Sequence, residues 1–289
     1  MTDFAKDVKH AIRMQRRVIR KRLQYAVMRN VIPLNATERQ ITNTSVRVMA
    51  NSIPKAGTNL LSRLMRLLPG TVDRWTYHVD ESLSGLEHQI ECGRPGQVIT
   101  AHLPWTQALA DQFNRLDYRT FLMVRDPRDV VVSGVHYVTK MDMGHPLHRY
   151  LNSLPDDDAR LLAMINPPPA DLGIPDVWKN DSFRTFLPWF DEPACMVIRF
   201  EDLVGAQGGG SDEAQQQCIR NVAKHMRMDL SDDQLDTITK ALFGNKSRTF
   251  RKGQIGDWPN HFNDAHKAAY KKQAGDVLIK MGYETGLDW

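Results

Sequence analysis

The chain contains the stretch VRVMANSIPKAGTNLL between Val46 and Leu61. Its first residues form a short apolar run typical of a buried strand, and a glycine-containing turn leads from them into an apolar helix. The same succession recurs along the chain. Strands are predicted at 46–51, 98–102, 119–124 and 195–200, and helices at 58–68, 105–114 and 128–141. This alternation predicts one α/β domain with a central parallel sheet flanked by helices, which binds ligands beyond the carboxyl ends of its strands.

The turn after the first strand has the chemistry of a P-loop-like phosphate-binding loop. Lys55, Gly57 and a helix start at Thr58 bring a cation and unpaired backbone amides to one point, which favours an anion. It is not a Walker A loop, because the lysine precedes the glycine. A capped turn with a surface lysine fits the same residues, so this segment alone leaves both interpretations open.

Two later segments also carry cations. Arg125 ends a predicted strand and Ser133 follows it in RDPRDVVVS, so both side chains can meet one phosphate if the helix between them turns back. A salt-bridged turn is the alternative.

The segment RKGQIGDWPNHF, from Arg251 to Phe262, combines two adjacent cations with two glycines. Arginine can bind phosphate through two hydrogen bonds and glycine allows close backbone approach, so this segment predicts an anion clamp.

Together these three segments resemble the sulfotransferase family. PKAGTN is similar to the family's 5′-phosphosulfate loop, usually PKSGTT, and the last segment is similar to its RKGxxGDWxNxF signature. The resemblance covers roughly residues 46–283. It implies an enzyme that moves a sulfuryl group from 3′-phosphoadenosine 5′-phosphosulfate (PAPS) to an acceptor hydroxyl or amine, releasing adenosine 3′,5′-bisphosphate (PAP). The donor-binding residues that it implies are Lys55, Ala56, Gly57, Thr58, Asn59, Leu60, Arg125, Ser133, Arg251, Lys252 and Gly253.

The resemblance also implies two catalytic residues. Sulfuryl transfer needs charge neutralisation on the leaving phosphate and a base for the acceptor proton. Lys55 suits the first role, and His102 suits the second because it follows the strand at 98–102 in ITAHLP, similar to the family's THLP context. No metal is expected, since fixed cations can supply the charge. Three positions depart from the usual pattern: Thr100 and Leu60, where many cytosolic members carry Lys and Trp, and Phe200, where the usual residue is Tyr.

Composition and charge narrow the remaining possibilities. The chain has 289 residues and a net charge of +4, but residues 1–30 carry nine Lys or Arg against two Asp, so the rest of the chain is −3. This body is too close to neutral to indicate nucleic-acid binding. No apolar run reaches the length of a membrane span and no secretory leader is recognisable, so a cytoplasmic protein is expected. The three cysteines have no metal-ligand spacing.

The basic N-terminal part of the chain, residues 1–40, is predicted to be a separate helical segment attached to a sulfotransferase domain at 41–289. Its apolar residues fall on one helical face and its basic residues on the other. Such a helix either binds an anionic membrane or an acidic partner, or packs on the body through its apolar stripe. Both interpretations remain open from the sequence.

The acceptor is expected to be a small molecule or a lipid-linked hydroxyl such as a glycolipid. Candidate acceptor-binding segments are 75–80, 142–175 and 183–190. Their aromatic residues either line an apolar pocket or pack in the core; they are Trp75, Tyr77, Phe186, Trp189 and Phe190. Two other functions compete with sulfuryl transfer: a magnesium-dependent phosphotransferase with an unusual loop, and a non-catalytic nucleotide-binding module.

Overall fold

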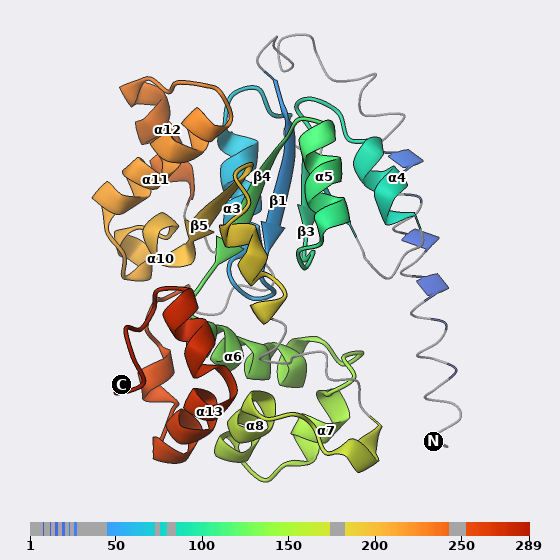
Figure 1. Cartoon of the computed structure of the whole chain (residues 1–289), viewed down its shortest axis with the longest axis vertical. Helices are drawn as coiled ribbons and strands as arrows, with labels where there is room; N and C mark the ends of the chain where they lie inside the picture. Colours follow the sequence, from blue (N-terminus) through green and yellow to red (C-terminus); the bar gives the residue numbers. More distant parts are fainter. Residues whose placement is uncertain are drawn as a thin grey trace.

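A five-stranded parallel sheet forms the centre of the computed structural model (Figure 1). The structure describes residues 45–72, 76–79, 85–173, 183–242 and 253–289, with scattered positions between 8 and 27. The strands lie in the order β2-β3-β1-β4-β5. Their bounds are β1 Arg47–Ser52, β2 Thr76–His78, β3 Val98–Ala101, β4 Tyr118–Val124 and β5 Cys195–Arg199. The predicted α/β fold with a central parallel sheet is therefore confirmed.

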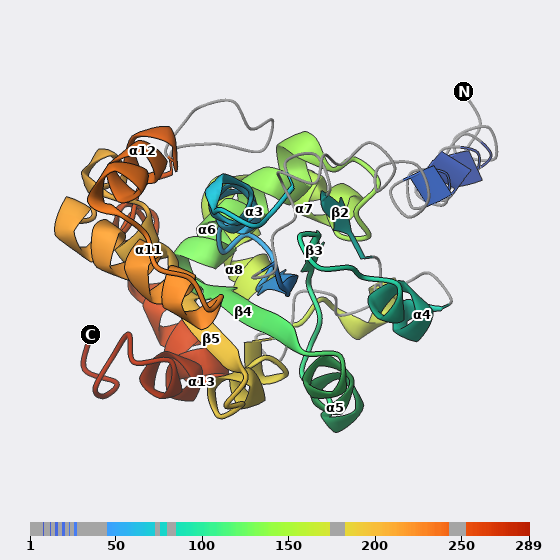
Figure 2. The ribbon, with the colours of Figure 1, turned by 90° about the horizontal axis from the view of Figure 1, so that it is seen from above.

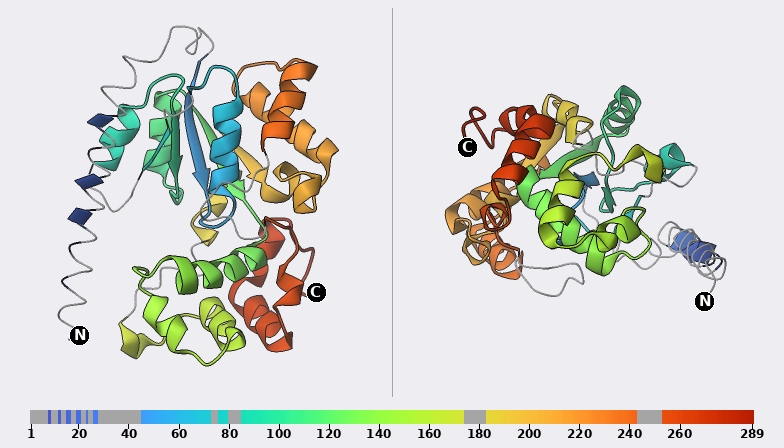
Figure 3. Two further views of the ribbon diagram at one scale, coloured as in Figure 1. Left: turned by 180° about the vertical axis from the view of Figure 1, so that it is seen from behind. Right: turned by 90° about the horizontal axis from the view of Figure 1, so that it is seen from below.

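Helices surround the sheet on its sides and below its carboxyl ends (Figures 1 and 2). Helix α3 covers β1, α4 lies towards the β2 edge, α5 packs against β4, and α10, α11 and α12 lie towards the β5 edge. A separate group, α6, α7, α8 and α13, lies beyond the carboxyl ends of the strands (Figures 1 and 3). The α-helices are α3 Thr58–Leu67, α4 Leu86–Glu91, α5 Gln107–Arg115, α6 Pro127–His136, α7 His148–Ser153, α8 Asp157–Ile165, α10 Phe200–Leu203, α11 Asp212–His225, α12 Asp232–Leu242 and α13 Asp264–Lys280. Shorter turns are η1 Tyr137–Met141, η2 Ala170–Leu172, η3 Leu187–Phe190, η4 Ala206–Gly208 and η5 Trp258–Asn260.

The strand register brings the ends of β1, β3 and β4 to one edge. Ser52 pairs with Met123 of β4, and Asn51 pairs with Ala101 of β3. The central strands are buried on both faces, which explains their continuous apolar sequence. The loops that follow Ser52, Ala101 and Val124 consequently start side by side, and these are the loops that carry the predicted site.

The predicted elements agree with the structure to within two residues for the four strands and for the first two helices. The helix predicted at 128–141 is divided: α6 ends at His136 and a π-helical turn, η1, continues to Met141. The sequence prediction was incomplete in two places. Strand β2 lies in the segment assigned to an acceptor loop, and the irregular stretch 142–175 contains α7 and α8. Helix α8 is capped by the Asp156 side chain, which accepts from the amide of Ala159.

The structure decides between the two interpretations of the aromatic residues in the candidate acceptor segments. Tyr77, Phe186 and Trp189 are at most 6% exposed and belong to the hydrophobic core. Trp189 stacks on Phe113 and donates a hydrogen bond to the Leu103 carbonyl. These aromatic side chains therefore pack the core, which was the alternative interpretation. Phe190 is only partly buried against the same core, and Trp75 lies outside the described residues.

The described positions before residue 28 are helical and exposed. Val8, Ile12, Ile19, Leu23 and Val27 keep 40–63% of their surface accessible. At these positions the apolar stripe does not pack into the core, which contradicts the interpretation that this stripe is buried against the body. Over the described residues, no helix combines the length and apolar character that crossing a membrane requires.

Candidate functional site

The loop after β1 turns sharply into α3. The amide of Ile53 donates to the carbonyl of Met123, which fixes the start of the loop to β4. Lys55 has a left-handed backbone with φ 67°, and Gly57 has φ 114° at the N-cap of α3. A Cβ at Gly57 would approach the Phe200 ring to 2.8 Å, so only glycine fits here. Phe200, which departs from the family's usual Tyr, thus forms one wall of this turn.

Lys55 lies half-buried with its ammonium group 3.9 Å from the centroid of the Tyr137 ring on η1. Burial, and secondarily the positive charge of Arg125, lower the pKa of Lys55 to about 8. The two cations therefore repel each other within one site, and a bound anion would relieve this repulsion. This electrostatic coupling joins the first and second predicted phosphate segments.

His102 is anchored to the end of β1. Its Nδ1 lies 2.8 Å from the carbonyl oxygen of Ser52 and 3.2 Å from the Ser52 hydroxyl. Because a carbonyl oxygen can only accept, a neutral His102 carries its proton on Nδ1 and its basic atom is Nε2. The Ser52 hydroxyl also lies 2.7 Å from the hydroxyl of Thr58, which is one of the residues predicted to bind PAPS. Ser52 thus links the candidate base directly to the phosphate loop.

Asn51 fixes the backbone that carries His102. Its side-chain amide donates to the carbonyl of Leu103 and its side-chain oxygen accepts from the amide of Leu103, both at 2.8 Å. Asn51 is only 1% exposed, so both bonds form in the protein interior. Neither Asn51 nor Ser52 was predicted to belong to the site. Their partners are about 50 residues away in the chain, and the only available signal was two polar residues at the end of an apolar strand.

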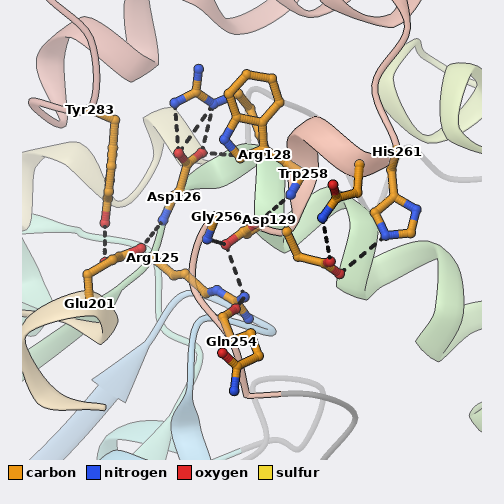
Figure 4. A network of polar contacts seen from close by, with 12 residues as sticks. Arg125, Asp126, Arg128, Asp129, Glu201, Gln254, Gly256, Trp258, His261 and Tyr283 are labelled. Carbon is orange, nitrogen blue, oxygen red and sulfur yellow. Dashed lines mark hydrogen bonds and ion pairs between the residues drawn. The ribbon is translucent and has the colours of Figure 1, made fainter. Parts of the chain in front are cut away.

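Arg125 lies buried between β4 and the C-terminal loop (Figure 4). Its guanidinium donates to the Asp129 carboxylate at 3.1 Å and to the Gln254 carbonyl at 2.6 Å, and it lies 4.5 Å from the Phe200 ring centroid. Within the part of the chain that the structure describes, its Nε is buried and has no hydrogen-bond partner. An unsatisfied buried donor on a cation fits an anionic ligand such as a phosphate.

Asp129 holds the C-terminal loop against α6. Its two carboxylate oxygens accept hydrogen bonds from the amides of Gly256 and Trp258, both at 2.9 Å (Figure 4). The same loop is tied to the glycine-rich segment after β5, since Ile255 donates to the carbonyl of Gly208. The second and third predicted segments are therefore brought together. Asp129 was not assigned a role from the sequence because its partners lie more than 120 residues away.

A second network supports the start of α6 (Figure 4). Asp126 caps the helix and accepts from the Arg128 guanidinium, while its own amide donates to the Glu201 carboxylate. Tyr283 donates to the other oxygen of Glu201 at 3.0 Å. Burial raises the pKa of Glu201, and these hydrogen bonds oppose the rise. The RDPRD segment is thus both an ion-paired turn and part of the candidate site; the two interpretations are compatible.

The other predicted ligands lie around these loops. Ala56 is fully buried beneath the first loop, and Asn59 is exposed on the first turn of α3. Leu60, in place of the family's Trp, packs partly against the core. Ser133 is half-buried on α6.

The predicted clamp at 251–253 is described only in part. Arg251 and Lys252 lie outside the described residues. Gly253 has φ 63°, and a Cβ at Gly208 would come within 2.7 Å of its carbonyl oxygen. In the described residues, no group of three or more His, Cys, Asp or Glu side chains is arranged to hold a metal ion.

Comparisons with known proteins agree with this geometry. A family model of the sulfotransferase domain matches residues 46–282. The chain therefore belongs to the sulfotransferase family, and the prediction of a PAPS-dependent sulfotransferase is confirmed at the level of the family.

Individual relatives are distant. Sulfotransferase 6B1 of Danio rerio is 24% identical over 66% of this chain, and the match spans 64% of that protein, less than two thirds of its length. Sulfotransferase 2A1 of Mus musculus is 24% identical over 81% of this chain and 84% of its own. The crystal structure of mouse sulfotransferase SULT7A1 complexed with PAP has a TM-score of 0.57 at 17% identity, covering 86% of this chain and 92% of the mouse chain. At this identity the likeness shows the fold.

Proposed function

We propose that this protein transfers the sulfuryl group of PAPS to an acceptor hydroxyl by in-line displacement. The observation that carries the proposal is the chain of contacts from Thr58 through Ser52 to Nδ1 of His102. These contacts support the role of His102 as the base, because they join its ring through Ser52 to the loop that we propose binds the phosphosulfate. His102 takes the acceptor proton at Nε2, and Lys55 stabilises the negative charge that develops on the departing phosphate.

The proposed PAPS-binding residues fall into two groups, one for each end of the nucleotide that carries a phosphate. Residues 55–60 hold the 5′-phosphosulfate through the α3 amides and Lys55, and Arg125 and Ser133 hold the 3′-phosphate together with Arg251, Lys252 and Gly253. The support for the second group is the unsatisfied Nε of Arg125 and the docking of the C-terminal loop on Arg125 and Asp129. The support for Arg251 and Lys252 is the sequence motif alone.

A transfer assay tests this function against the competing ones. The full chain is incubated with PAPS and a panel of phenols and alcohols in the presence of a chelator, and sulfated product and PAP are detected by mass spectrometry. Equimolar formation of both is expected. Phosphorylated product, formed only in a parallel sample in which ATP and magnesium replace PAPS and chelator, would instead support a phosphotransferase. PAP binding with no transfer to any acceptor would support a non-catalytic binding module.

The acceptor in this proposal is a small molecule or a lipid-linked hydroxyl, and the enzyme acts in the cytoplasm. In this proposal residues 1–40, most of which lie outside the described residues, are a basic segment separate from the sulfotransferase domain at 41–289, and residues 1–30 contact an anionic membrane. Support for the contact comes from the exposed apolar positions of this helix and the +7 charge of residues 1–30. An exposed apolar stripe with basic flanks is the pattern of helices that lie in a membrane interface.

Vesicle binding tests the membrane contact without removing any charge. Replacing Ile12, Ile19 and Leu23 together by serine should abolish co-sedimentation with phosphatidylserine vesicles, because the apolar face no longer inserts. Leu162→Ser on α8, which is also an exposed apolar residue at 38% exposure, should bind as the unmodified chain does. Equal binding of all three proteins would refute the contact.

A further inference from the structure

Trp289 folds back onto the start of α6. The guanidinium carbon of Arg128 lies 4.5 Å from the centroid of the Trp289 ring and 4.0 Å from the centroid of the Trp258 ring. The two indole rings also meet edge-on, with their centroids 5.4 Å apart. A cation over an aromatic face attracts it, so Arg128 holds together two tryptophans from separate segments of the chain.

Carboxylates fix the position of this cation. The Arg128 guanidinium donates to the Asp126 carboxylate at the start of α6 (Figure 4) and to the Glu284 carboxylate, which lies in the same segment as Trp289. The Arg128 side chain is only 4% exposed, so these ion pairs are shielded from water. Residues 281–289 are therefore fastened to α6 by an ion pair as well as by a ring.

Trp258 belongs to the C-terminal loop that docks on α6. Its backbone amide donates to one carboxylate oxygen of Asp129, and the other oxygen accepts from the amide of Gly256 and from Arg125 (Figure 4). Arg125 also donates to the carbonyl of Gln254 in the same loop. A contact that fixes Trp258 therefore also fixes the part of the loop that lies against Arg125.

Trp289 makes these contacts with its ring. Within the described residues its Nε1 is buried and has no hydrogen-bond partner. The Tyr270 ring lies 6.4 Å away between centroids, and the Lys271 ammonium lies 4.9 Å from the centroid of the indole. What Trp289 supplies is thus an aromatic face and not a hydrogen bond. Phenylalanine keeps such a face, whereas leucine keeps only apolar volume.

We propose that Trp289 is a positioning residue of the donor site, which holds Trp258 and the C-terminal loop against Arg125 before the nucleotide binds. This inference rests on the proposed function, in which Arg125 and this loop bind the 3′-phosphate. Trp289 acts through Trp258 and does not itself bind the nucleotide. Without its ring the loop is docked in only a fraction of the molecules, and the apparent affinity for a 3′-phosphate falls by that fraction.

PAP and adenosine 5′-monophosphate form a matched pair of probes, since they differ by the 3′-phosphate. In calorimetric titrations of the full chain, Trp289→Leu should bind PAP about tenfold more weakly, the scale of one partly buried cation–π contact. Its affinity for adenosine 5′-monophosphate should stay unchanged. Trp289→Phe should retain most of the PAP affinity. Leu287→Ala, an exposed residue of the same segment, is the control and should bind both nucleotides as the unmodified chain does.

The outcomes separate this inference from the function beneath it. A loss confined to PAP in Trp289→Leu, and restored in Trp289→Phe, supports the positioning role. Unchanged PAP affinity in Trp289→Leu overturns the inference and leaves the donor site standing. An equal loss for both nucleotides, or a variant shown by circular dichroism to be unfolded, also overturns it, because Trp289 then supports the fold as a whole. Equal affinities in the unmodified chain refute the proposed 3′-phosphate site itself.

Discussion

Replacing His102 by alanine should lower kcat for sulfuryl transfer by at least about 100-fold, the usual effect of removing a general base. The His102 imidazole is held by the Ser52 carbonyl at the end of β1. Removing the ring removes Nε2, the atom that takes the proton from the hydroxyl of the acceptor. The affinity for PAP should stay unchanged, because His102 does not bind the nucleotide in this account. Steady-state kinetics and calorimetry on the same preparation measure both quantities.

His88→Ala is the matched control for His102, since it removes an exposed imidazole of α4 that lies outside the proposed site. It should retain full turnover. A His102→Ala enzyme with near-normal kcat would remove the histidine from the mechanism. A loss of PAP affinity equal to the loss of turnover would mean that His102 supports the donor loop, through Ser52 and Thr58, and is not the base.

Replacing Lys55 by methionine should lower kcat by about 100- to 1000-fold, the range seen when one preorganised charge-stabilising group is removed. The pH dependence makes the role of its charge testable. The pKa of Lys55 in the free protein is lowered to about 8, by burial and then by Arg125. The cation is therefore present below this pH and lost above it. We expect kcat/KM for PAPS to fall as the pH rises through about 8.

Lys55→Arg is the control for the pH effect, because arginine stays protonated throughout this range. Its activity at neutral pH can be lower, since the guanidinium has a different shape, but the fall on the alkaline side should disappear. An alkaline fall of the same size and midpoint in Lys55→Arg would assign that titration to another group. An unchanged kcat in Lys55→Met would show that Lys55 does not stabilise the leaving phosphate.

The sequence predicted those parts of the fold whose signal is local. Strands β1, β3, β4 and β5 contain apolar runs, and the loops around Lys55 and Arg125 are contiguous motifs, so both could be located from the residues. Strand β2 was missed because three residues at a sheet edge give almost no periodic signal. Helices α7 and α8 were missed because their segment is rich in Pro and Asp, which resembles a loop.

The supporting residues of the site could not be predicted for a different reason. Asn51 acts on Leu103, and Asp129 acts on Gly256 and Trp258, across separations of 52 to 129 residues. No spacing rule connects such positions before the register of β1, β3 and β4 is known. The aromatic residues of the candidate acceptor segments show a second limit, because the sequence left pocket lining and core packing both open. Composition shows that Tyr77 and Trp189 are large and apolar, but only the packing shows that they fill the core.

The proposed function depends on one donor pocket in which the cations of separate loops bind a nucleotide that carries phosphates at both the 5′ and the 3′ position. Calorimetric titration of the full chain with PAP, in chelator, tests this most directly, with adenosine 5′-monophosphate as the comparison. We expect PAP to bind at least about tenfold more tightly, since the 3′-phosphate adds charge-assisted hydrogen bonds to Arg125 and the C-terminal loop. Equal affinities for the two nucleotides, in protein shown by circular dichroism to be folded, would contradict the account.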